Sequence, residues 1–342
     1  MKERLRYIDV AKGMLIILVI IRHLPQLSAE YGISNNLLVL LKKCSPCYLA
    51  FFMPAFFLVT GYCTDFHKST LIQFFIRQFK SIMIPAFCLG AVSIWISLIA
   101  KGCGDLSEYY KIGIRTFIFQ GGAFWFLSAL FIAKNLLKIW YLIMSKLKIE
   151  QGKKSFLLTF AFCLFLLVVA CFFQQQGIVN VWYFQHAFSL IVFLFVGQLF
   201  KYFHIEKTYL LCSFLYVVAI LYYYMFRKEL PYITAGFHIT FLSIIPYIVL
   251  AVLGSILCIY VSIKVNKNRF LEFLGKNSLL IYTLHIAVMT LILNVGKKTF
   301  GMSVVCNDWF TVLYICLTIL VLMILVRFFN LKYLRILLGK FN

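Results

Sequence analysis

Long apolar runs separated by short polar segments make up most of this chain. The runs cover residues 8–27, 45–63, 80–100, 117–142, 155–173, 181–200, 208–226, 238–263, 278–295 and 309–330. Each run is long enough to cross the ~30 Å hydrocarbon core of a bilayer as a helix. Because the runs are continuous and do not alternate with polar residues, helices are favoured over a β-barrel. The pattern predicts an all-α polytopic membrane bundle of about ten transmembrane helices.

Composition supports this prediction. The chain is 63% hydrophobic and 13% charged, and a soluble domain would carry about twice that charged fraction. We find no internal repeat, no low-complexity tract and no long polar segment, so we expect one integral membrane domain over residues 1–342. The first run lacks a small-residue cleavage site, which predicts a retained span and not a signal peptide.

The distribution of basic residues predicts the topology. The net charge is +22, but the Lys and Arg residues are dotted between the apolar runs and form no basic domain. We therefore expect membrane lipid and a cytosolic polyanionic ligand as partners, and no nucleic acid. With the N-terminus inside, about two thirds of the basic residues fall in cytosolic segments, so both termini are predicted to be cytosolic.

The 11 cysteines are mostly scattered singly through apolar runs, where cysteine behaves as a small hydrophobe. Cys44 and Cys47 form a CxxC, and a local disulfide between them is one interpretation. With no second CxxC and no histidine nearby, a zinc site is not predicted. We expect no metal.

The first run keeps four ionisable residues, although each charge at a bilayer centre costs roughly 2.5–3.5 kcal/mol. Lys12 and His23 are eleven positions apart, which places them on one helix face with ~16 Å between them along the axis. Asp9 lies close enough on that face to pair with Lys12. Arg22 points about 100° away and is expected to snorkel towards outer headgroups. Topology anchors and a packing histidine are the alternatives to a functional stripe.

Other candidate residues are more widely spaced. His285 lies about two turns inside the ninth run, and His186 lies near the outer end of the sixth. Trp125 stands at the outer end of the fourth run, where aromatic residues often anchor a span. Arg77 and Lys80 precede the third run at its inner end, and they either fix the topology or dock phosphate groups.

Several stretches together resemble the membrane-bound acyltransferases of family 3, in particular the fucose O-acetylase-like branch of polysaccharide O-acetyltransferases. The matching stretches occur in family order across almost the whole chain: Asp9 with Lys12-x10-His23, Met53–Tyr62 (MPAFFLVTGY), Arg77–Pro85, Trp125–Leu127 (WFL) and Leu274–His285 (LGKNSLLIYTLH). Three positions depart from the family pattern. Lys12 replaces the commoner Arg, Thr60 replaces the usual Ser, and Ser81 replaces a basic residue.

The resemblance implies an O-acetyltransferase of the bacterial inner membrane that moves acetyl from acetyl-CoA to a hydroxyl of a cell-envelope glycan or lipid-linked glycan. His23, with Asp9, is then the catalytic candidate, as base or as acyl relay. The polyanionic acetyl-CoA would contact Lys12, Arg77 and Lys80. The acceptor would contact Trp125, His186 and His285.

Two further classes of function remain compatible with the sequence. A bundle with embedded charges and many aromatic residues also suits a transporter or flippase of a lipid-linked glycan. The second class is a sensory membrane module that keeps the fold but catalyses no reaction. The register of Lys12 and His23 argues against both, because neither class needs it.

Overall fold

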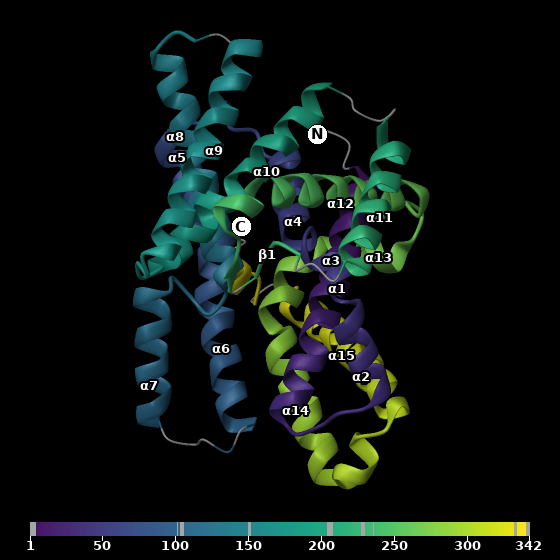
Figure 1. The fold of residues 1–342 in the computed structure, drawn as a ribbon. Helices are drawn as coiled ribbons and strands as arrows, with labels where there is room; N and C mark the ends of the chain where they lie inside the picture. Colours follow the sequence, from purple (N-terminus) through teal and green to yellow (C-terminus); the bar gives the residue numbers. More distant parts are fainter. Residues whose placement is uncertain are drawn as a thin grey trace. The chain divides into compact units, whose positions relative to one another are not determined.

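The computed structural model describes residues 5–100, 102, 106–149, 152–203, 208–226, 230–234, 236–331 and 334–339. Figure 1 shows helices throughout. The described residues form no larger sheet than the hairpin of β1 (Tyr232–Ile233) and β2 (Phe237–His238), which pair antiparallel. The predicted all-α fold is confirmed.

Seven helical stretches of the described residues are long and apolar enough to cross a membrane, and one bent helix pair brings the number to eight. The seven are Leu71–Ala100, Trp125–Lys146, Lys153–Gln175, Val181–Tyr202, Phe241–Lys264, Ser278–Val305 and Asp308–Phe329, and the pair is Asn36–Leu49 with Phe52–Cys63. A polytopic helical membrane protein follows. Two of the ten predicted runs are helices outside these eight: α1 (Arg6–Glu30), which carries the embedded charges, and α11 (Tyr209–Met225), which is 17 residues long.

One predicted boundary is wrong. The fourth run was expected to be helical from residue 117, but α8 begins only at Trp125. A π-helical turn over Arg115–Phe119 precedes two glycines with positive φ, Gly121 at 69° and Gly122 at 125°. Since side chains disfavour such angles, the two glycines end one helical segment before α8 begins.

The described residues fall into two compact units, each built from separate stretches of the chain. The first comprises described residues within Met1–Cys47, Ile84–Phe124 and Asn266–Asn342. Its helices are α1, α2 (Asn36–Cys44), α6 (Ile84–Ala100), α7 (Leu106–Ile114), η2 (Arg115–Phe119), α13 (Arg269–Lys276), α14 (Ser278–Val305), α15 (Asp308–Phe329) and η6 (Leu334–Leu338). The single domain predicted for the chain stays a prediction.

The second unit comprises described residues within Tyr48–Met83 and Trp125–Val265. Its helices are α4 (Phe52–Cys63), α5 (Leu71–Gln78), η1 (Phe79–Met83), α8 (Trp125–Lys146), α9 (Lys153–Gln175), η3 (Val181–Tyr183), α10 (Phe184–Phe203), α11, η5 (Phe241–Ser243) and α12 (Ile244–Lys264). The short α3 (Pro46–Leu49) lies where the stretch of the first unit ends and that of the second begins.

Polar caps fix the helix ends of the first unit. The side chain of Asn35 accepts a hydrogen bond from the backbone N–H of Leu38 at 2.9 Å and so caps α2. The same side chain donates to Thr311 Oγ1 at 2.8 Å, and Asp308 Oδ1 accepts from the N–H of Leu37 at 2.8 Å. These bonds tie the start of α2 to the start of α15. Cys44, the last residue of α2, and Cys47, which follows three residues later, do not form a disulfide.

Glycines allow the second unit to pack closely. Gly61 lies against the backbone of Leu194, and Gly197 lies against that of Leu58, so neither position has room for a methyl group. Gln198 Nε2 then donates to the carbonyls of Gly61 and Thr64. The MPAFFLVTGY stretch therefore holds α4 against α10 through a small residue and through carbonyls that accept from the Gln198 side chain.

Candidate active site

The N-terminal half of α1 is held by α13 at two glycines. A Cβ atom at Gly13 would overlap the carbonyl of Leu271, and one at Gly275 would overlap the carbonyl of Asp9. The Asp9 side chain is only 2% exposed. The glycine of the LGKNSL stretch is therefore required by the approach of α13 to the first helix.

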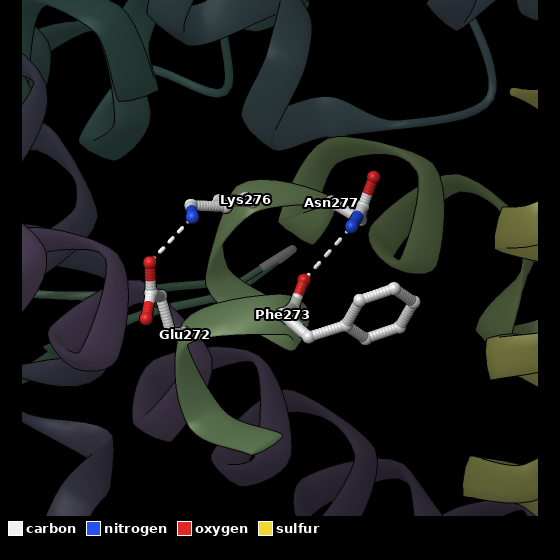
Figure 2. Close-up of polar contacts among 4 residues, drawn as sticks. All are labelled: Glu272, Phe273, Lys276 and Asn277. Carbon is white, nitrogen blue, oxygen red and sulfur yellow. Dashed lines mark hydrogen bonds and ion pairs between the residues drawn. The ribbon is translucent and has the colours of Figure 1, made fainter. Parts of the chain in front are cut away.

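The end of α13 sets the direction of α14. Asn277 Nδ2 donates to the carbonyl of Phe273 at 2.9 Å, and Lys276 pairs with Glu272 on the exposed side of α13 (Figure 2). Asn277 also accepts through Oδ1 from Asn330 Nδ2 at 3.3 Å, which ties the junction to the residue after α15. α14 starts at Ser278 and packs on α1. The motif thus positions α14 beside the first helix.

This packing brings His23 of α1 and His285 of α14 together. The centroids of the two imidazole rings are 5.1 Å apart and their planes are inclined by 51°. His285 is 2% exposed, and His23 is half-buried. The ring of Tyr282, from the same IYTLH stretch, lies 5.6 Å from that of His285. Two histidines predicted for different roles therefore form one cluster.

Hydrogen bonding defines the state of His285. Its Nδ1 is 2.7 Å from the carbonyl of Tyr282, and a carbonyl can only accept, so Nδ1 carries the proton. In the neutral ring Nε2 then carries the lone pair. Nε2 of His285 and Nδ1 of His23 are both buried and have no hydrogen-bond partner among the described residues. Nε2 of His285 thus keeps a lone pair that the described residues around it do not use.

Arg22 is a candidate site residue for which no catalytic or binding role was predicted from the sequence. It was expected to reach outwards, but its Nε is buried and has no hydrogen-bond partner in the described part of the chain. Arg22 directly precedes His23, so a guanidinium donor lies one residue from the histidine cluster. Its signal in the sequence was a charge within an apolar run. Lys12 is half-buried on the same continuous helix, and its pairing with Asp9 stays a prediction.

The second unit brings Trp125 and His186 together, with ring centroids 5.0 Å apart. His186 is 2% exposed. Asn180 Nδ2 lies 2.7 Å from its Nδ1, and its Nε2 lies 2.9 Å from the carbonyl of Thr234. Both ring nitrogens are therefore satisfied, which gives His186 a structural role in joining Thr234 to α10. Its predicted contact with an acceptor stays a prediction.

Arg77 and Lys80 are exposed at the junction of α5 and η1. The guanidinium of Arg77 lies over the ring of Phe74, 5.4 Å from its centroid. The Lys138 ammonium lies 5.9 Å from the same centroid. Lys138 is a buried residue of α8 that donates to the carbonyls of Phe66 and Ser69 at 2.6 Å each.

Comparison with known proteins gives one match. The family model described as an acyltransferase domain, of family 3, matches residues 5–327. No curated protein and no solved structure matches the chain. The matched range includes most of each unit and all the candidate residues. It also favours acyl transfer over a flippase or a sensory module. The chain therefore belongs to the family-3 membrane acyltransferases.

Proposed function

We propose that this membrane acyltransferase moves acetyl from acetyl-CoA to a hydroxyl of a cell-envelope polysaccharide or its lipid-linked precursor. The fucose O-acetylase-like branch and the bacterial inner membrane belong to the same proposal. The observation that carries it is the pair of His23 and His285, whose ring centroids are 5.1 Å apart, in a chain of this family. A thioester is already activated, so the enzyme needs a base for the hydroxyl and a stabiliser for the oxyanion.

In the proposed reaction His23 takes the proton of the acceptor hydroxyl. The hydroxyl oxygen attacks the thioester carbonyl and forms the new C–O bond. When the tetrahedral intermediate collapses, the C–S bond breaks and the proton passes from the imidazolium to the CoA thiolate. His285 holds the geometry of His23 through ring contact, and Arg22 supplies the donor for the oxyanion. Lys12, Arg77 and Lys80 are proposed to contact the phosphates of CoA.

The test is acetyl transfer from labelled acetyl-CoA by membranes that contain the full chain, with total envelope glycan as the acceptor pool. We expect His23→Ala to lower transfer by about 10²- to 10⁴-fold, with unchanged amounts of inserted protein. Wild-type activity in that variant would contradict the assignment.

Incubation with labelled acetyl-CoA in the absence of acceptor distinguishes a covalent relay from direct transfer. Labelled acetyl-protein that forms in the wild type and is lost in His23→Ala supports a relay through the histidine. Transfer without such a species supports direct attack.

A further inference from the structure

The second unit contains a cavity of about 610 Å³ among the ends of α4, α8, α9 and α10. This volume is in the range of small-molecule sites. The cavity is distinct from the histidine cluster, which lies wholly in the first unit. None of the candidate residues found from the sequence lines it.

Positive charge is present in the lining of the cavity. Lys148, after α8, and Lys201, near the end of α10, both line it. Ser155 lines it from the first turn of α9, whose N-cap is Gly152 and whose first N–H groups receive no side-chain cap. Amides at the start of a 23-residue helix favour anions. A phosphate would therefore meet two ammonium groups and a helix N-terminus.

Asp65 is the opposing charge. Partial burial raises its pKa, but the N–H of His67 and the charges of Lys201 and Lys68 outweigh this and hold the pKa below its usual value. Asp65 is therefore ionised at neutral pH and reduces the attraction of the cavity for anions.

Lys148 has a backbone conformation that lysine rarely adopts, which suggests that its side chain is kept for binding. Its φ is 52°, and the N–H of Ile149 donates to the carbonyl of Met144 at 3.0 Å, so Lys148 closes α8 in a Schellman motif. Glycine is favoured at this position because other residues are strained there. A lysine that lines a cavity from a position where glycine would be more stable indicates a ligand for its ammonium.

Aromatic rings also line the cavity. Phe156 and Tyr202 both line the cavity, with centroids 5.0 Å apart in an edge-to-face arrangement. Tyr141 lines it as well, and its ring lies 5.0 Å from that of His67. Such rings suit a flat aromatic group on the ligand.

We propose that this cavity binds a nucleotide, with its phosphates at Lys148, Lys201 and the start of α9 and its base against the aromatic rings. The ligand is either a free nucleotide or the nucleotide end of coenzyme A. In the second case the inference rests on the proposed function and deepens it, with Lys148 and Lys201 in place of Lys12, Arg77 and Lys80 as the contacts of the CoA phosphates.

The test is calorimetric binding to the purified full chain in lipid nanodiscs. Adenosine 3′,5′-bisphosphate, coenzyme A, ATP and adenosine are the probes. We expect binding of the phosphorylated probes and at least about tenfold weaker binding of adenosine. Coenzyme A and the bisphosphate binding more tightly than ATP would identify the acyl donor as the source, and equal affinities would identify free nucleotides. Absence of binding by every phosphorylated probe would overturn the proposal. No acyl group is used, so this failure differs from a failure of transfer.

Variants distinguish a loss of binding at the cavity from a general effect on folding. Lys148→Gly is expected to raise the thermal stability, because it relieves the positive φ, and to weaken nucleotide binding about tenfold or more. Asp65→Asn is expected to strengthen binding. The control is Lys264→Gln with Lys267→Gln, two exposed residues that do not line the cavity. Unchanged affinity in Lys148→Gly, or an equal loss in the control, would contradict the site.

Discussion

The imidazole of His285 donates from Nδ1 to the carbonyl of Tyr282 and lies 5.1 Å, between centroids, from the imidazole of His23. Backbone bonding thus fixes one histidine, and that histidine packs against the other. This relationship makes His285 a positioning residue for His23 in the proposed reaction, and its Nε2 remains available to accept a proton.

The His285→Ala variant tests this relationship. We expect kcat to fall by about 10²-fold, because His23 loses the ring that holds its orientation, while KM for acetyl-CoA stays the same. Steady-state kinetics with varied acetyl-CoA measure the two constants.

His285→Asn is the matched control, since its amide can still donate to the carbonyl of Tyr282 and fill part of the space. It should recover part of the lost kcat. Equal defects in kcat and KM for both variants would point instead to general disruption of α14.

The close contact between α1 and α13 at their glycines is expected to be necessary for stability. Gly275→Ala places a methyl group against the carbonyl of Asp9, and such overpacking costs about 1–3 kcal/mol of unfolding free energy. A lower midpoint of thermal unfolding in detergent would show this effect. Gly152→Ala is the control, because no atom lies within 4 Å of the position that its methyl group would occupy. Equal midpoints for the two variants would contradict the close approach.

Lys12 is expected to act through its charge. Lys12→Gln should raise KM for acetyl-CoA by about 10- to 100-fold, the loss of a charge-assisted hydrogen bond to phosphate, with a smaller effect on kcat. Lys12→Arg keeps the charge and matches the residue commoner in the family, so it should stay near the wild-type KM. A KM that is the same in all three proteins would remove Lys12 from the donor site.

Lys138 is expected to be structural. Lys138→Met leaves the carbonyls of Phe66 and Ser69 without their donor, which should cost about 1–3 kcal/mol. Chemical unfolding of purified protein measures the change. Lys146→Met, at an exposed position of the same helix, should leave stability unchanged. A neutral Lys138→Met would mean that water replaces the ammonium.

The helical state of the apolar runs could be predicted from the sequence, because a long apolar run in a membrane must satisfy its backbone hydrogen bonds within itself. The start of α8 could not, since two adjacent glycines with positive φ override an apolar run that continues through them. His23 was found through its spacing from Lys12. Its partnership with His285 depends on packing between distant segments, which periodicity along one helix does not report.

The first unit draws its helices from both ends of the chain, and this order has a consequence for biosynthesis. α1 emerges from the ribosome early, with Asp9 and His23. Its partners α13 and α14 are made only after α12. Until then the partners that bury those polar groups do not exist. Contacts so distant in sequence form late in folding. The first helix therefore lacks its contacts with α13 and α14 until the C-terminal part of the chain has been made, and a chaperone or insertase that shields its polar residues would act in that interval.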